Sequence, residues 1–135
     1  MGRVFADAAY YTALLLPGDD LHSIALGTGR ELRTTEIVTS DPVLVEVFAH
    51  MSGLGPVARS RAVSLLDELR ADPRVRIMRQ TPHLFDAGVE LYRQRKDKAY
   101  SLTDCMSMIV CREGRITGVL THDRHFQQEG LAILL

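Results

Sequence analysis

Short apolar runs alternate with helix-length segments along this chain, and this alternation restricts the possible folds more than any other feature. Strands that are separated by helices usually pair in parallel, and the helices then cover both faces of the sheet. We therefore predict an α/β domain with a mainly parallel sheet of four or five strands. The predicted strands are Val4–Ala6, Glu36–Thr39, Val75–Met78, Ile116–Leu120 and Leu131–Leu134.

The intervals between these runs carry helix patterns with recognisable ends. Pro and Gly stop several of them, and Ser-Asp-Pro or Thr-Pro starts others. We expect the helix that carries Leu21, Ile24 and Leu26 to end or bend early, because Gly27 and Gly29 are poor helix formers. The other predicted helices are Ala8–Leu16, Val43–Met51, Val57–Ala71, a segment from Pro82 to the basic run at Arg93, Leu102–Glu113, and a short helix or turn at His122–Glu129.

Size and composition indicate an ordinary globular protein. The 135 residues suggest one domain over 1–135, and 46% hydrophobic with 24% charged residues excludes a disordered chain. The formal net charge of -1 argues against binding nucleic acid through overall charge, so such binding would need local basic patches.

Location can be inferred from apolar runs and cysteines. The longest apolar run is too short to cross a bilayer, and no signal peptide is visible before the first strand, where Met1-Gly2-Arg3 leads directly into it. Cys105 and Cys111 lie on one predicted helix about 9 Å apart along its axis, too far for a relaxed disulfide. Reduced thiols and a cytoplasmic location are therefore expected, with no membrane partner.

Four acidic residues stand where a parallel sheet places its ligands. Asp7 and Asp123 follow the carboxyl ends of predicted strands, which is where open parallel sheets bind ligands. Asp104 lies in the first turn of a helix, and Glu46 lies on a helix with apolar neighbours and no Lys or Arg one turn away. We predict that these four carboxylates form one cluster.

Each acid also has a simpler structural explanation. Asp7 and Asp123 could each cap a helix, and Glu46 could point to solvent. Asp104 could complete a capping box, because it follows Ser101 by three residues with Asp in place of Glu or Gln. Taken singly, capping is the commoner use of such residues. It accounts less well for four acids in low-charge surroundings near strand ends.

A cluster of four carboxylates implies either a raised pKa in at least one of them or a bound cation. Carboxylates without Cys or His neighbours favour hard ions, Mg²⁺ or Mn²⁺, and such ions suit phosphodiester hydrolysis. Zinc is an alternative, since His50 lies one helical turn from Glu46 and His122 and His125 flank Asp123. The sequence lacks His-Glu-x-x-His, which weakens that alternative.

The acids and their surroundings resemble the PIN domain, and more narrowly the VapC-type toxin ribonucleases of bacterial toxin–antitoxin pairs. The similarity extends over essentially the whole chain in motif order and spacing. Its most specific elements are Ser101-Leu102-Thr103-Asp104 and the stretch from Thr121 to Phe126. The resemblance implies a PIN-like three-layer fold and an Mg²⁺- or Mn²⁺-dependent endoribonuclease, active on RNA, that forms a homodimer and is neutralised by a cognate antitoxin.

The same resemblance assigns roles to residues. Asp7, Glu46, Asp104 and Asp123 would be the catalytic, metal-binding acids, and Ser101 and Thr121 would be hydroxyl supports. Many relatives have Thr or Ser directly after the first acid, whereas this chain has Ala8-Ala9. We expect weaker support of the metal site there, not its loss.

The basic residues after Tyr92 have two explanations. As a solvated helix end they would be favoured by the helix dipole, and as RNA contacts they would bind phosphates, as the resemblance implies. The candidate RNA-binding residues are Arg93, Arg95, Lys96, Lys98 and Arg124. Two other functions are alternatives. One is a catalytically weak or inactive PIN-like binding module. The other is an Mg²⁺-binding phospho-acceptor domain, for which the acid pair and a suitably placed Lys are missing.

Overall fold

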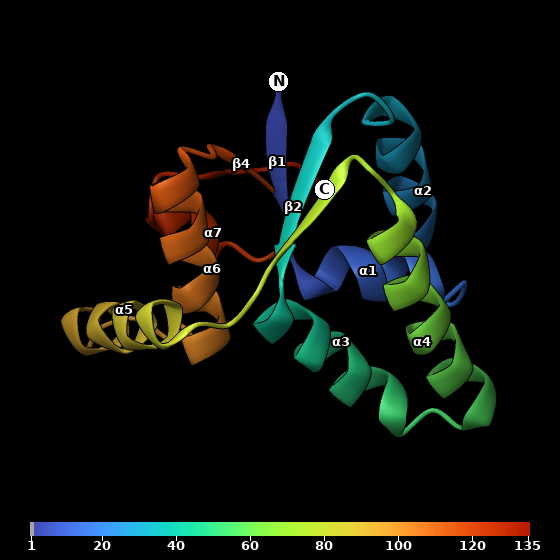
Figure 1. The fold of residues 1–135 in the computed structure, drawn as a ribbon, viewed down its shortest axis with the longest axis horizontal. Helices are drawn as coiled ribbons and strands as arrows, with labels where there is room; N and C mark the ends of the chain where they lie inside the picture. The colour runs from blue at the N-terminus through green and yellow to red at the C-terminus, as the bar shows by residue number, and fades with distance from the viewer. Residues whose placement is uncertain (1) are drawn as a thin grey trace.

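A computed structural model describes residues 2–135 of the chain (Figure 1). Within that range the strands form one five-stranded parallel sheet in the order β3-β2-β1-β4-β5. The predicted parallel sheet is confirmed. The strands are β1 (Arg3–Ala6), β2 (Glu36–Ser40), β3 (Val75–Met78), β4 (Gly118–Leu120) and β5 (Ala132–Ile133).

Helices cover both faces of this sheet, so the domain has three layers (Figure 1). The helices α1, α2 and α4 lie on one side, and α5, α6 and α7 lie on the other, with α3 below the carboxyl ends of the strands and in contact with both α1 and α6. The helices are α1 (Ala8–Leu15), α2 (His22–Glu31), α3 (Asp41–Ser52), α4 (Pro56–Ala71), α5 (Pro82–Gln94), α6 (Leu102–Gly114) and α7 (His125–Gln128).

The strand order places a switch point between β1 and β4. From β1 the chain adds β2 and then β3 in one direction, and it later returns to add β4 and β5 on the other side. The connections leaving β1 and β4 therefore diverge at the carboxyl end of the sheet. A crevice at such a point is the usual ligand site of an open parallel sheet.

The core consists mainly of the central strands and α6. Val4, Phe5 and Ala6 of β1 are fully buried, and every residue of α6 from Asp104 to Cys111 is buried. A continuous apolar run of this kind is expected where both faces of a parallel sheet are covered. Both cysteines are buried and free, as the sequence predicts.

Most predicted elements are confirmed to within one or two residues. The predicted early end of α2 is wrong, because the helix continues through Gly27 and Gly29 to Glu31. Gly29 lies against Tyr10, where an added Cβ would come within 2.9 Å of the phenol oxygen, so the close packing uses the absent side chain. β4 is also shorter than predicted: it begins at Gly118 rather than Ile116, following the left-handed residue Arg115 that ends α6.

No helix within the described residues has the length and apolar character that crossing a membrane requires. The prediction that no signal peptide precedes the first strand rests partly on Met1, which lies outside the described residues.

Candidate metal centre

The first two site residues meet at the carboxyl ends of β1 and β4. Ala6 pairs with Leu120 in the sheet register, and the Asp7 backbone N–H donates to the Leu120 carbonyl at 3.2 Å. The next residues along each strand are therefore side by side. The Thr121 hydroxyl donates to Asp7 Oδ2 at 2.9 Å, and both residues are buried. Thr121 thus supports Asp7 directly and supplies a hydroxyl that Ala8 does not.

Asp7 is 6% exposed and takes the position before α1, but its side chain accepts none of the hydrogen bonds of a helix cap. The pKa of Asp7 is raised from 3.8 to about 6. Burial is the largest cause and the charges of Asp104 and Asp123 act in the same direction, while hydrogen bonding to Thr121 and to the Ala8 N–H lowers the pKa. The predicted raised pKa is therefore present. Its main cause is burial, however, and not the mutual repulsion on which the prediction rested.

Asp104 completes a capping box at the start of α6, as its spacing predicts. Ser101 Oγ accepts from the Asp104 N–H, and Asp104 Oδ2 accepts from the Ser101 N–H, both at 3.0 Å. The side chain of Asp104 is only 11% exposed. Ser101 therefore fixes the backbone that carries Asp104, and the cap holds one carboxylate oxygen at the helix N-terminus, where the dipole favours negative charge.

Asp123 is held by its own loop. Its backbone N–H donates to Thr121 Oγ1 at 3.1 Å, and its Oδ1 accepts from the His125 N–H at 2.9 Å. The second bond spans two residues, the pattern by which Asp stabilises a local turn. The alternative that Asp123 caps a helix is wrong, because the residue before α7 is Arg124 and the helix has no side-chain cap.

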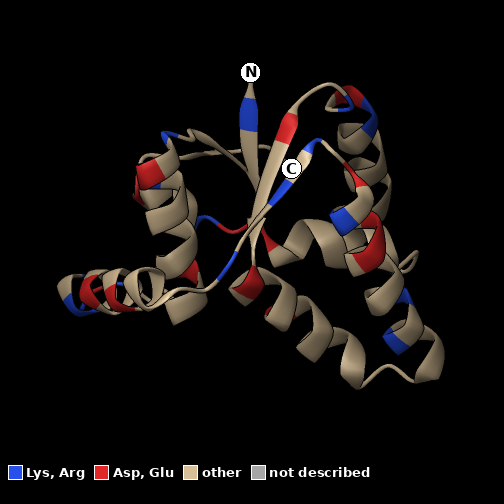
Figure 2. Ribbon diagram, in the orientation of Figure 1, with Lys and Arg blue, Asp and Glu red and all other residues tan. Residues whose placement is uncertain are grey.

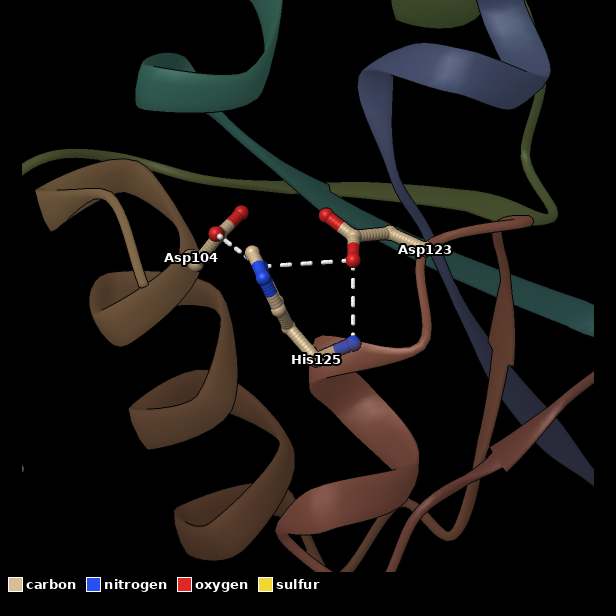
Figure 3. A group of neighbouring side chains, drawn as sticks. All are labelled: Asp104, Asp123 and His125. Carbon is tan, nitrogen blue, oxygen red and sulfur yellow. Dashed lines mark hydrogen bonds and ion pairs between the residues drawn. The ribbon is translucent and has the colours of Figure 1, made fainter. Parts of the chain in front are cut away.

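His125 lies between two of the acids. Its Nδ1 is 3.2 Å from Asp104 Oδ2 and 3.3 Å from Asp123 Oδ1, and the three ligand atoms lie within 4.8 Å of one another (Figure 3). Its ring also lies at 5.4 Å from that of Tyr100. The sequence-based argument for a hard cation assumed that the acids have no His neighbour, and this assumption is wrong.

Glu46 lies on α3 and is exposed. Partial desolvation raises its pKa, and the charges of Asp7, Asp104 and Asp123 raise it further. The Glu46 carboxylate is therefore within electrostatic reach of the other three acids. Acidic segments at the starts of α1 and α6 lie below the sheet, on the side of the carboxyl ends of its strands (Figure 2).

The four acids share one unusual property. Among the ion pairs formed by residues 2–135, none joins Asp7, Glu46, Asp104 or Asp123 to a Lys or Arg. Carboxylate oxygens concentrated with no Lys or Arg partner in that range fit a divalent cation, since the cation would supply the missing positive charge. The donor set of carboxylate oxygens and one imidazole nitrogen therefore suits a hard or intermediate divalent metal.

The predicted RNA-binding residues lie mostly along one groove. This groove, of about 440 Å³, is lined by Val89, Tyr92, Arg93, Arg95, Lys96, Lys98 and Tyr100. An adjoining groove shares Val89, Tyr92 and Tyr100 and continues to Ser101, whose backbone binds Asp104. The basic groove thus leads toward the acids. Arg124 lies outside it, in the loop between Asp123 and His125, and is exposed.

One of these basic residues has a structural role. Arg95 binds Glu129 through two hydrogen bonds of 3.0 Å, and the Tyr100 hydroxyl donates to the same carboxylate at 2.9 Å. These bonds connect the segment after α5 to the chain after α7. Because Tyr100 also contacts His125, they hold the wall of the groove against the site.

His125 was considered from the sequence only as a ligand of the zinc alternative, and neither Tyr100 nor Glu129 was predicted to lie at the site. His125 has a local signal, since an Asp two residues before it commonly forms a turn with its N–H. Glu129 has none, because its partners lie 29 and 34 residues away along the chain.

The fold is similar to that of several solved structures. VapC20 from Mycobacterium tuberculosis, described as a toxin that cleaves the sarcin–ricin loop, superposes with a TM-score of 0.83 at 23% identity over 96% of each chain. FitAcB from Neisseria gonorrhoeae gives 0.66 at 15% identity, over 98% of this chain and 96% of that one. VapBC2 from Rickettsia felis, bound to a DNA fragment from its promoter, gives 0.66 at 14% identity, over 98% and 97%.

Comparison with curated proteins gives no match. The family model for the PIN domain matches residues 4–130, a range that contains all four acids, Thr121 and His125. The match spans nearly all of the 135 residues. The chain therefore belongs to the PIN domain family.

Proposed function

We propose that this protein is a divalent-metal-dependent endoribonuclease that acts as the toxin of a toxin–antitoxin pair. The observation that carries the proposal is the group of four carboxylates, with no Lys or Arg partner among the described residues, at the switch point of a PIN fold. Membership of the PIN family supports a nuclease. The similarity of fold to VapC20 agrees with a toxin that cleaves RNA.

Each residue of the site has a proposed role. Asp7, Asp104, Asp123 and Glu46 would hold Mg²⁺ or Mn²⁺, and Thr121 would orient Asp7 through its 2.9 Å hydrogen bond. When bound, the ion supplies activation of water and stabilisation of the charge that develops on the phosphate. Burial of Asp7 and Asp104 keeps bulk water from these carboxylates, which strengthens their interaction with a cation.

RNA would approach along the basic groove beside α5. Arg93, Lys96 and Lys98 line it and would contact phosphates, while the exposed Tyr92 offers a ring on which a base can stack. Arg124 follows Asp123 directly and would contact a phosphate next to the cleaved bond. The net charge of -1 makes this local patch necessary, because overall charge provides no attraction.

A cognate antitoxin is the proposed partner. FitAcB and VapBC2 have this fold, and the second was solved with promoter DNA, which agrees with a toxin that associates with a DNA-binding partner. We also propose a homodimer and a cytoplasmic location, as the family resemblance implies. The alternative of an inactive binding module gives the opposite result in the experiment below.

The test is cleavage of a mixed pool of structured RNA by antitoxin-free protein, with Mn²⁺ or Mg²⁺ and with EDTA. Glu46→Gln is the informative variant, because Glu46 is exposed and its loss should leave the fold unchanged. Glu68→Gln on α4 is the matched control, since that residue is also exposed. We expect metal-dependent cleavage by the wild type and the control, and a loss of at least 100-fold in Glu46→Gln, roughly the effect of removing a catalytic charge.

In ¹⁸O-labelled water, the cleaved phosphate should acquire ¹⁸O, because water is the proposed nucleophile. A folded wild-type protein that leaves every RNA intact, or a Glu46→Gln variant that cleaves at the wild-type rate, would contradict the proposal. The first result would favour a binding module.

A further inference from the structure

The position of His125 has a consequence for the metal. Its Nδ1 lies 3.2 Å from Asp104 Oδ2 and 3.3 Å from Asp123 Oδ1 (Figure 3). Around an octahedral ion with bonds of about 2.1 Å, neighbouring ligand atoms lie about 3.0 Å apart. The separations of the nitrogen from the two oxygens are therefore close to those of neighbouring ligands on one ion.

The imidazole is also held in this orientation. The backbone N–H of His125 donates to Asp123 Oδ1 at 2.9 Å, which fixes the start of α7. On the other side the ring contacts Tyr100, whose hydroxyl is held by Glu129. A ligand that is oriented before the ion arrives loses less side-chain entropy on binding.

We propose that His125 Nδ1 binds the same divalent ion as Asp104 and Asp123, and that this nitrogen makes the site prefer Mn²⁺ to Mg²⁺. The inference rests on the metal site proposed above. Mg²⁺ binds oxygen ligands almost exclusively, whereas Mn²⁺ accepts an imidazole among oxygens and forms the stronger bond to it.

The neighbouring cysteine does not add a sulfur ligand. The Cys105 side chain is fully buried, and its sulfur is not among the ligand atoms that Asp104, Asp123 and His125 bring together. The donor set therefore has one nitrogen among oxygens, which differs from the Cys- and His-rich sets of zinc proteins.

Pulsed EPR of bound Mn²⁺ tests the proposal without using activity. The spectrum is recorded for the wild type, for the wild type with ¹⁵N-labelled histidine, and for His125→Ala. His122→Ala is the matched control, because His122 lies in the same loop and is exposed. We expect a histidine-nitrogen coupling that changes with the label, disappears in His125→Ala and persists in His122→Ala.

Calorimetric titration of the same proteins with MnCl₂ and MgCl₂ gives the second readout. The preference for Mn²⁺ over Mg²⁺ should fall by about 10-fold or more in His125→Ala and stay at the wild-type value in His122→Ala. If His125→Ala does not fold, a labelled-histidine coupling that persists in His122→Ala and in His50→Ala assigns the nitrogen to His125, and its loss in either variant would overturn the assignment.

Two outcomes would overturn the proposal, and only one of them would also overturn the proposed metal site. Bound Mn²⁺ without a histidine coupling would remove His125 from the ligands and leave the carboxylate site intact. No bound Mn²⁺ at millimolar concentration in folded wild-type protein would overturn both this inference and the proposed metal site.

Discussion

The Thr121 hydroxyl donates a 2.9 Å hydrogen bond to the buried carboxylate of Asp7 across 114 residues of sequence. The same oxygen accepts the backbone N–H of Asp123 at 3.1 Å. One side chain at the end of β4 therefore fixes the acid at the end of β1 and the acid in its own loop. This arrangement depends on the parallel pairing of β1 with β4, which aligns their carboxyl ends.

Replacing Thr121 tests this connection. Thr121→Val keeps the shape but removes the donor to Asp7 and the acceptor for the Asp123 N–H, so we expect a loss of roughly 1–3 kcal/mol in the free energy of unfolding. Thr121→Ser should lose less, since it keeps the hydroxyl. Urea denaturation measures both, with Thr117→Val as the control, because Thr117 is exposed. Equal stability of Thr121→Val and Thr121→Ser would show that the hydroxyl is unimportant.

The raised pKa of Asp7 makes metal-free stability depend on pH. Folding raises this pKa from 3.8 to about 6, so the folded state binds the proton more tightly and stability falls as pH rises from about 4 to about 6. The difference corresponds to roughly 3 kcal/mol above pH 6. Asp7→Asn carries no charge and should lack this fall.

Urea denaturation of wild type and Asp7→Asn in EDTA, between pH 4 and 7.5, measures the effect. At neutral pH the variant should be the more stable protein, and millimolar Mn²⁺ should raise the melting temperature of the wild type only. If the free energies of unfolding of the two proteins change with pH in parallel, the pKa of Asp7 is not raised in the folded protein.

The pair formed by Arg95 and Glu129 should matter more than the pair formed by Arg93 and Glu90. The Glu129 side chain is 11% exposed and also binds Tyr100, whereas Glu90 is exposed and binds its neighbours on one helix. We expect Glu129→Gln to lower the melting temperature by several degrees and Glu90→Gln to change it by about 1 °C or less.

The stabilisation that Glu129 contributes should also depend on pH. Hydrogen bonding to Arg95 lowers the pKa of Glu129, so the stabilisation is present above the ordinary value of 4.5 and is lost as pH falls through the lower folded value. The difference between wild type and Glu129→Gln should therefore shrink in acid. A difference that grows there would be contrary to this assignment.

The basic groove should contribute to RNA affinity in two ways, through phosphate contacts and through base stacking. Both are measured as RNA binding by variants that also carry Glu46→Gln, which prevents cleavage. Lys96→Ala with Lys98→Ala should weaken binding and reduce the salt dependence, by roughly 0.7 in slope for each lost phosphate contact. Tyr92→Ala should weaken binding without changing the slope, because stacking releases no counterions. Arg30→Ala with Arg33→Ala, at exposed positions in and just after α2, is the control. An equal effect of the control would place RNA elsewhere.

The strands, most helices and the acid positions could be predicted from the sequence because they depend on local patterns. β-branched runs, Pro at helix starts and the Ser101–Asp104 spacing each act within a few residues. The parallel sheet then places Asp7 and Asp123 at one edge for topological reasons. The positions of Asp104 and Glu46 beside them were predicted less directly, from the helix first turn and the apolar surroundings of Glu46, and the family resemblance agreed with that prediction.

The features that the sequence did not reveal depend on packing between distant segments. α2 persists through two glycines because Gly29 lies against Tyr10. The burial of Asp7, which dominates its pKa, follows from how α1, α3 and α6 close around it. His125 enters the acid cluster only because α7 packs against α6, and a histidine in a loop carries no sign of that contact.

The central claim is that the four carboxylates converge on one metal centre. Its most direct test is an anomalous difference map from crystals soaked in MnCl₂. The account predicts a peak within ligand distance, about 2.2 Å, of carboxylate oxygens from Asp104 and Asp123, with Asp7 and Glu46 around it directly or through water. Crystals that bind Mn²⁺ only at sites away from these acids, or not at all with the cluster open to solvent, would contradict it.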